Sequence, residues 1–440
     1  MNKAFATRCK HVATVFGTIL LVLAVLSPVS LAQQKVQLEL LHGWSGFREP
    51  MVQQMIDEFM QEYPWIEVEA RLVPHGELDD QFLLTYAAGM APDVVMLTTK
   101  HVIAFADRGA LVDLTPFIER DGIDWEIWVP SEIEGGQWQG GTYGLPIRTG
   151  GEAGNILYYN KRLFAEAGLS PERAPATWDE LLTYSKKLIR YDDEDRIVVN
   201  PINDLTQGAS AQATLNWIYS GGATLMSDDM RTIAFNSQAA ADAMSFAHQF
   251  RSEVYRNPDD DKMGNEAFYA QQSAMFFWGS EGFSYVWDQD PDFPLGAGPR
   301  PKHPDSPYIG ANQGTWRYVM SDTAADKEAA WLLIKWLTIR EESAGWFIRA
   351  QGRPSPIRAY NLHPEYFEVN PLITVVGEVL EQVANVPMLP IFDDIVVPVR
   401  NAFREVLAGT NAPGPALQAA AERAQGILDQ YWAEVDAQKQ

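Results

Sequence analysis

Apolar residues along the chain alternate between a spacing of two and the spacing of a helix. Residues 35–41 alternate apolar and polar, and residues 50–63 place their apolar side chains on one helical face. Residues 66–72 alternate again, residues 77–89 read as a helix ending at glycine, and residues 92–97 form a short apolar run. Another helical stretch follows. This order predicts β–α–β units, which are typical of a doubly wound parallel sheet.

The alternation resumes after a glycine-containing stretch at 146–154. Residues 155–160 predict a strand, and Thr177 is placed to cap a helix with Glu180 completing a capping box. The other elements predicted here are helices at 209–220, 237–254 and 324–340, a strand at 273–277 and a long helix after Pro415. We find no internal repeat and no low-complexity linker. The 440 residues therefore predict an α/β fold of two doubly wound lobes between which the chain crosses several times.

Residues 1–32 are predicted to be a secretory signal peptide. Three basic residues precede an apolar run at 12–26, and the small-x-Ala pattern at 30–32 offers cleavage after Ala32. The alternative is a permanent membrane anchor, which needs about 20 apolar residues, and this run is shorter. No cysteine follows the run, so a bacterial lipid anchor is not expected. The mature chain is predicted to be periplasmic, or extracellular where there is no outer membrane.

Composition narrows the chemistry of the mature chain. The single cysteine, Cys9, lies in the predicted signal peptide, so disulfides, cysteine-bound metals and cysteine nucleophiles are excluded. The formal net charge of −24 becomes −27 when the three basic residues of that peptide are lost. Such an acidic protein is repelled by nucleic-acid phosphates and anionic lipids, so we expect no nucleic-acid partner. A content of 46% hydrophobic and 21% charged residues is typical of a globular protein.

The chain lacks the motifs of common catalytic and metal sites. G-x-S-x-G, the Walker loop and H-E-x-x-H are absent, and the histidines are not spaced as metal ligands. Two acidic stretches at 191–196 and 257–265 do not fit the EF-hand calcium loop, and we interpret them as solvated turns. No pair of carboxylates stands out for glycoside hydrolysis. We expect no catalytic residue, no metal ion and no cofactor.

A series of short segments covers nearly the whole mature chain in a characteristic order. They are "HGWSG", "FMQEYPWIEV", "AAGMAPDVVML", "RGALVDLTPFI", "YGLP…LYYNKRLFAEAGL…ATWDELL", "SAMFFWG", "AAWLLIKWLT" and "GRPSP". Each is weak alone, but their order and spacing resemble those of family 1 of the bacterial extracellular solute-binding proteins, the maltose-binding-protein-like group. The resemblance implies a two-lobed periplasmic-binding-protein-like fold of type II. It also implies a non-enzymatic protein that holds a sugar between its lobes and delivers it to the permease of an ATP-binding-cassette (ABC) importer.

In that family the first crossing between lobes follows the Y-G-L-P stretch. Pro146 and three glycines at positions 150, 151 and 154 permit a change of backbone direction there. Further crossings are expected at 300–305 and 350–354. The predicted division assigns residues 33–148 and 303–350 to lobe 1, and residues 149–302 and 351–440 to lobe 2.

Candidate ligand-binding residues follow from the chemistry of a sugar. A pyranose has an apolar face and a ring of hydroxyls, so it calls for aromatic platforms and planar hydrogen-bonding groups. Ligands bind at the carboxyl ends of strands in doubly wound sheets. The candidates, placed by these arguments and by the resemblance, are Trp44, Thr98, Lys100, Arg148, Glu152, Gln207, Trp278, Ser280, Glu281, Gly314, Thr315, Trp316 and Arg353.

Several candidates have a plain structural alternative. If they do not contact ligand, Trp44 and Trp278 would be buried side chains that cover the cores of their lobes. Trp316 would then point inward from its strand. Arg148 would be an ion-pair partner, and Lys100 a solvated surface lysine. Tryptophans at core-like helical spacing are assigned to packing, and they are Trp178, Trp331, Trp336 and Trp346.

Two other function classes stay open from the sequence. One is a binding protein for glycerol phosphate or another polyol derivative, which would use Arg148, Arg353 and helix N-terminal amides rather than aromatic stacking. The less favoured one is an exported glycoside-processing enzyme. The sequence does not name the sugar or its length. A monomer is expected.

Overall fold

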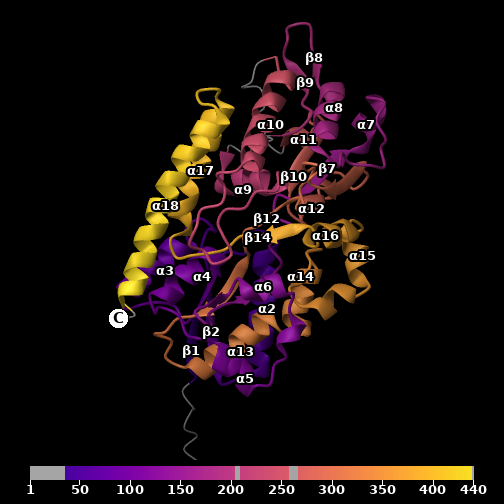
Figure 1. The fold of residues 1–440 in the computed structure, drawn as a ribbon. Coiled ribbons are helices and arrows are strands. Elements are labelled where there is room, and N and C mark those ends of the chain that lie inside the picture. The colour runs from indigo at the N-terminus through magenta and orange to yellow at the C-terminus, as the bar shows by residue number, and fades with distance from the viewer. Residues whose placement is uncertain (1–34, 204–208, 257–265, 439–440) are drawn as a thin grey trace, which may run out of the picture.

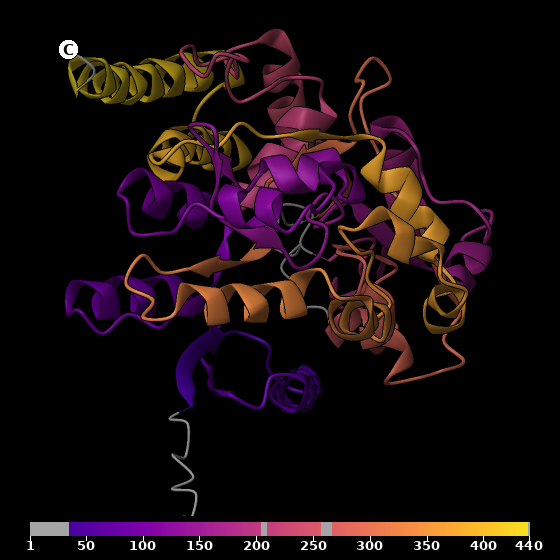
Figure 2. The same ribbon diagram turned by 90° about the horizontal axis from the view of Figure 1, so that it is seen from below.

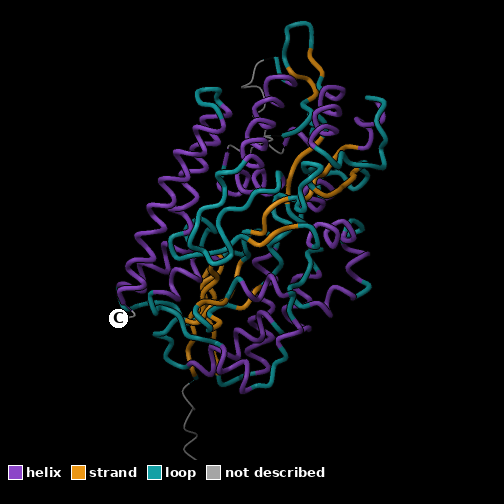
Figure 3. Tube along the Cα trace, in the orientation of Figure 1, coloured by secondary structure: helices purple, strands orange, loops and turns teal. Residues whose placement is uncertain are grey.

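The computed structural model describes residues 35–203, 209–256 and 266–438. The predicted signal peptide and Gln207 lie outside these residues. Figure 1 shows two lobes stacked one on the other, with two long helices along one side. The strands run through the middle of the lobes and most helices lie outside them (Figure 3).

A five-stranded sheet forms the centre of the first lobe. The strands are arranged in the order β2-β1-β3-β13-β6. Strand β1 pairs in parallel with β2 and β3, whereas β13 runs antiparallel to β3. The bounds are β1 (Val36–His42), β2 (Ile66–Leu72), β3 (Val94–Thr98), β6 (Leu145–Pro146) and β13 (Trp316–Met320). The predicted alternation of strands and helices is thus confirmed in this lobe, and a distant segment adds the antiparallel strand.

Helices cover both faces of this sheet because its strands are apolar on both sides. One face carries Leu40 and Met96 and packs against α2 (Arg48–Glu62) and α13 (Lys327–Thr338). The other face packs against α3 and α4. The remaining elements of the lobe are α3 (Leu78–Ala87), α4 (Thr99–Asp107), α5 (Thr115–Arg120), η1 (Trp125–Ile127), α6 (Pro130–Glu134), β4 (Gln137–Trp138) and β5 (Gly141–Thr142).

The second lobe contains a three-stranded sheet in which β7 (Ile156–Asn160) lies between β10 (Met275–Trp278) and β11 (Leu295–Pro299). Both neighbours run antiparallel to β7. A doubly wound lobe would have parallel strands here, so this part of the prediction is corrected. Met275 opens β10 opposite Tyr159, so the helical connection returns the chain to the end at which β7 stopped, and β10 runs back.

Helices between these strands begin where capping residues predict. Thr177 accepts a hydrogen bond from the Glu180 amide, whereas the Glu180 carboxylate reaches the Ala176 amide. Ser210 and Ser237 cap the next two long helices. The elements are α7 (Lys161–Glu166), α8 (Trp178–Leu188), β8 (Arg190–Tyr191), β9 (Ile197–Val199), α9 (Ala211–Ser220), α10 (Gln238–Val254), α11 (Glu266–Tyr269) and α12 (Gly282–Trp287).

The last part of the chain connects the lobes and adds the outer helices. Helix α18 packs on α17 and α10, on the side of the molecule opposite α2 (Figure 2). The elements are β12 (Gly310–Asn312), η4 (Glu341–Gly345), α14 (Trp346–Arg349), η5 (Arg358–Leu362), α15 (Glu365–Val369), α16 (Ile373–Leu380), β14 (Val383–Asn385), α17 (Phe392–Leu407) and α18 (Pro413–Gln438). Strand β12 pairs with β14.

The return crossing lies later in the chain than predicted. Lys302 forms a bridge with Thr177, and Ser306 donates to the carbonyl of Tyr219, so this segment is attached to the second lobe. The chain enters the first sheet only at Trp316. The crossing therefore lies at 310–316 rather than 300–305, because backbone hydrogen bonds beside α8 and the Ser306 hydroxyl on α9 hold the earlier segment. The exact lobe boundaries stay predictions.

Candidate functional site

Aromatic and polar side chains of the first lobe gather at one edge of its sheet. Parallel strands β1, β2 and β3 end at this edge, and antiparallel β13 begins there. His42 ends β1 and Trp44 follows it, His75 follows β2, and Trp316 opens β13 opposite Thr98. The ring centroid of His75 lies 4.8 Å from that of Trp316 and 6.1 Å from that of Trp44. Of these residues, Trp44 and Thr98 were predicted from their places after strands, Trp316 came from the family resemblance, and His42 and His75 were not predicted.

Charged residues from three crossing or loop segments meet where the lobes join. Arg148 pairs with Glu152 at 3.0 Å, and Arg353 pairs with Glu281 at 3.1 Å. Ser280 donates a hydrogen bond of 3.2 Å to Glu152. We call these five residues the junction cluster. All five were predicted from the sequence as ligand contacts, and the structure brings them into one group.

The two ion pairs are mostly removed from solvent. Polar atoms of these side chains that have no hydrogen-bond partner therefore indicate where a ligand could bind. The side chains of Glu152 and Arg353 are 0% and 5% exposed. A buried charge is tolerated only when it is paired and hydrogen-bonded. Yet Nε of Arg148, Nε of Arg353 and Oε2 of Glu281 have no partner among the described residues. These atoms are therefore available to donate to, or accept from, the polar groups of a ligand.

The histidines beside the cluster are neutral at pH 7. Burial, followed by the charge of His75, lowers the pKa of His42 to about 4. Burial also lowers the pKa of His75 to about 4, with smaller contributions from Arg48, Arg148 and Arg353. The Nδ1 atom of His42 accepts from the Trp44 amide, as a neutral imidazole does. Neutral imidazoles both donate and accept hydrogen bonds, which suits them to hydroxyl groups.

The acids of the cluster respond differently to burial. Burial raises the pKa of Glu152 although Arg148 opposes it. Burial would also raise the pKa of Glu281, but Arg353, Arg148 and Arg48 outweigh it and hold this pKa below its usual value. Three arginines thus act on two carboxylates, and they create a locally positive region in a protein whose net charge is strongly negative.

Trp44 lies inside the first lobe rather than on a free surface. Its side chain is 1% exposed, and its indole N–H donates to the hydroxyl of Tyr318 at 3.2 Å. Phe347 packs against it edge-on with a centroid distance of 5.1 Å. The guanidinium groups of Arg48 and Arg353 lie over the ring at 5.8 and 5.9 Å. Trp278 and Trp316, in contrast, are only partly buried.

Four predicted residues near the crossings make contacts outside the junction cluster. Lys100 pairs with Asp393 of α17 at 2.6 Å, and Thr98 hydrogen-bonds to His101. Thr315 donates to the carbonyl of Thr149 in the first crossing. Gly314 has a positive φ of 83°, and a Cβ there would approach the Thr99 side chain to 2.4 Å. Only glycine therefore fits at position 314.

Glu132 of α6 is a functional candidate that the sequence did not reveal. Its Oε1 accepts hydrogen bonds from the Gly150 amide at 3.1 Å and from the Asn312 side chain at 3.3 Å. These partners belong to two different crossings. Burial, and then repulsion from Glu152, raise the pKa of Glu132 to about 7. No sequence signal marks it, because its short helix carries neither a motif nor a strand end.

A two-lobed α/β protein with a shared polar and aromatic cluster at the junction has the architecture of a protein that binds a ligand between its lobes. The sequence comparison agrees, because a model of the bacterial extracellular solute-binding protein family matches residues 47–342. The chain belongs to this family. Among the described residues, no group of three or more side chains is arranged to hold a metal ion. No described helix combines the length and the apolar character that a membrane crossing requires.

Individual relatives are distant but match over most of their length. A putative binding protein of Brucella abortus is 23% identical over 396 residues, covering 86% of this chain and 90% of that protein. A glycerol-3-phosphate-binding periplasmic protein of Pectobacterium atrosepticum is 23% identical over 428 residues, covering 91% and 93%. The structure of the sugar-binding protein MalE from Xanthomonas citri superimposes with a TM-score of 0.76 at 21% identity, covering 91% and 99%. These similarities confirm the two-lobed fold of type II.

Proposed function

We propose that this protein is exported, binds a sugar in a cleft between its lobes and delivers it to the permease subunits of an ABC importer. The observation that carries the proposal is the junction cluster, in which three segments bring buried, partly unbonded polar atoms together. Family membership supports a binding role. The protein is proposed to act as a monomer in the periplasm or outside the cell, without a lipid anchor and without a catalytic step.

The chemistry of the junction supports a sugar ligand. Trp278 and Trp316 are partly buried and offer apolar ring surface, while His75 is neutral and suited to hydroxyls. Arg148, Glu281 and the nearby Arg353 would supply planar hydrogen-bonding groups. In this arrangement Trp44 supports the arginines from within the lobe. The similar Xanthomonas citri structure is described as a sugar-binding protein.

A phosphorylated polyol is the second candidate ligand. The specific observation in its favour is the locally positive region made by Arg48, Arg148 and Arg353. Arginine binds phosphate through charge-assisted, often paired hydrogen bonds. The relative from Pectobacterium atrosepticum is named for binding sn-glycerol 3-phosphate.

Titration of the intrinsic tryptophan fluorescence against sugars and sn-glycerol 3-phosphate tests both candidates. We expect saturable binding of at least one sugar, and recovery of a labelled sugar unchanged. Trp278→Ala is expected to weaken that binding by about 1–3 kcal/mol, because the apolar ring surface is lost. Trp65→Ala, at an exposed position after α2, is the control and is expected to bind normally. Binding of glycerol phosphate alone would replace the sugar proposal, and turnover of the labelled sugar would contradict a pure binding role.

Ligand binding is expected to make the particle more compact. A ligand between two lobes contacts both only when they approach, so it shifts the population towards the closed form. The crossings at 147–155 and 310–316 are the segments expected to bend. Small-angle scattering with and without a saturating ligand measures the radius of gyration. An unchanged radius at saturation would place the ligand within a single lobe and contradict closure.

A further inference from the structure

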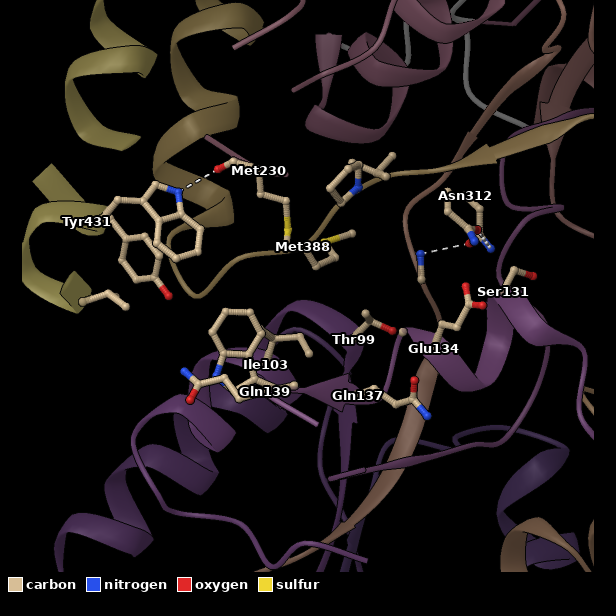
Figure 4. Close-up of a pocket in the computed structure, with 18 residues that line it drawn as sticks. Thr99, Ile103, Ser131, Glu134, Gln137, Gln139, Met230, Asn312, Met388 and Tyr431 are labelled. Atoms are coloured by element: carbon tan, nitrogen blue, oxygen red, sulfur yellow. Dashed lines mark hydrogen bonds between the residues drawn. The ribbon is translucent and has the colours of Figure 1, made fainter. Parts of the chain in front are cut away.

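A cavity lies between the lobes, and none of the five junction-cluster residues lines it. It has a volume of about 650 Å³. One wall comes from the first lobe and includes Ile103 of α4 and Trp138 of β4. The opposite wall includes Met388 and the residues Tyr431 and Trp432 of α18 (Figure 4).

The aromatic walls present apolar surface to this cavity. The indole N–H of Trp138 donates to Asp107 at 3.0 Å, and that of Trp432 donates to the carbonyl of Met230 at 2.7 Å. The polar atoms of both rings are thus satisfied. The guanidinium of Arg231 lies over the Trp432 ring at 4.3 Å, so only the remaining ring surface of Trp432 and Trp138 lines the cavity. The thioethers of Met230 and Met388 add adaptable apolar contacts.

The hydroxyl of Tyr431 is a buried polar group of this cavity that lacks a hydrogen-bond partner among the described residues. The side chain is only 8% exposed. In Figure 4 this oxygen points from α18 into the cavity. A buried hydroxyl without a partner costs free energy, so an acceptor placed beside it is stabilised.

The charges around the cavity select against an anion. The carboxylate of Glu134 lines it, and Asp107 is close enough to Tyr431 to raise the pKa of the phenol, after burial as the main cause. At the other end, Asn312 donates to Asn385 and accepts from the Gly314 amide, so these amides are already occupied. The lining also includes the polar side chains of Ser131, Gln137 and Gln139, which are partly or fully exposed. Among the described residues that line the cavity, Tyr431 supplies the buried donor without a partner.

We propose that this cavity is a second binding site, for a neutral, flat and mainly apolar molecule whose carbonyl or ether oxygen accepts a hydrogen bond from Tyr431. The cavity volume is in the range of pockets that enclose small organic ligands. None of the five junction-cluster side chains lines this site, although Asn312 and Gly314 of the return crossing do.

The dye 6-propionyl-2-(dimethylamino)naphthalene tests the site, since it is neutral and planar, carries one carbonyl and emits at shorter wavelength in apolar surroundings. We expect saturable, blue-shifted binding to the full-length mature protein. Tyr431→Phe removes only the hydroxyl and is expected to weaken binding about two- to tenfold. Met388→Trp fills the cavity and is expected to abolish binding. The control is Tyr63→Phe, at the end of α2 on the opposite side of the molecule, which is expected to bind as the unmodified protein does.

Each variant is checked for native circular dichroism, and Tyr431→Phe keeps the test decisive if Met388→Trp does not fold. Trp278→Ala separates this site from the junction and is expected to leave dye affinity unchanged. Three results would overturn the proposal: no saturable binding, equal affinity of the unmodified protein and the Tyr431→Phe and Met388→Trp variants, or loss of dye binding in Trp278→Ala alone. The sugar titration described above tests the junction directly, so failure of the dye site and failure of sugar binding can be distinguished.

Discussion

Replacing Trp44 with alanine is expected to lower the free energy of unfolding by about 3–5 kcal/mol, the usual cost of removing a large buried aromatic side chain. The indole is enclosed by Phe347 and neighbouring residues of the first-lobe core. Its removal leaves a cavity, and it deprives the Tyr318 hydroxyl of its hydrogen-bond donor. Denaturant unfolding followed by circular dichroism measures the change.

The matched control is Trp65→Ala. This tryptophan is 41% exposed, so its replacement is expected to change stability by less than about 1 kcal/mol. The comparison also decides between two roles for Trp44. A Trp44→Ala protein that keeps full stability but loses sugar affinity would show that the ring stacks on the ligand, as the sequence suggested, and would contradict the packing role assigned here.

The first lobe could be predicted closely because its signals are local. The alternating runs at 35–41 and 66–72 and the helical run at 50–63 each carry their own apolar period, and the structure places β1, β2 and α2 at nearly the same residues. The strand-end rule placed Trp44 and Thr98 after their strands, and the structure puts both at one edge of the sheet. Neither step requires knowledge of distant contacts.

Strand direction and burial could not be predicted in the same way. The period of β10 is the same whether it runs parallel or antiparallel to β7, and only the course of the long helical connection decides. Similarly, Trp44 follows a strand just as an exposed platform would, but Phe347 and Tyr318, about 300 and 270 residues later, close over it. Burial at position 44 is therefore a property of the folded chain and not of its local sequence.

The sequence predicted the five residues of the junction cluster as ligand contacts, but it did not predict which of them form ion pairs with one another. Arg148 and Glu152 are four residues apart, so their contact is local, whereas Arg353 meets Glu281 across 72 residues. Glu132 lies in a helix with no motif and gains its role only from two crossings that pass beside it. Chemistry that depends on several chain segments thus appears only in the structure.

Glu132 is expected to make stability depend on pH between about 4.5 and 7. Its folded-state pKa of about 7 lies above the ordinary value of 4.5, so between these values the folded protein binds a proton that the unfolded chain has released. Stability from this group is therefore complete below pH 4.5 and is lost as the pH rises to 7. A pKa difference of about 2.5 corresponds to about 3 kcal/mol. The charged form is disfavoured because it is buried beside Glu152.

Glutamine at position 132 removes the ionisation but keeps the acceptor that binds the Gly150 amide, so Glu132→Gln is expected to escape this loss. Relative to the unmodified protein, the variant should gain about 2.5 kcal/mol of stability between pH 5 and pH 8, measured by urea unfolding at both pH values. Glu134→Gln is the matched control, since Glu134 is exposed in the same helix, and its effect should be the same at both pH values. A constant difference for Glu132→Gln would mean that Glu132 is already ionised at pH 5 in the folded protein. In that case the Gly150 amide and the Asn312 side chain would donate their hydrogen bonds to an ionised carboxylate. The two crossings would then be connected through a buried charge and not through a neutral carboxylic acid.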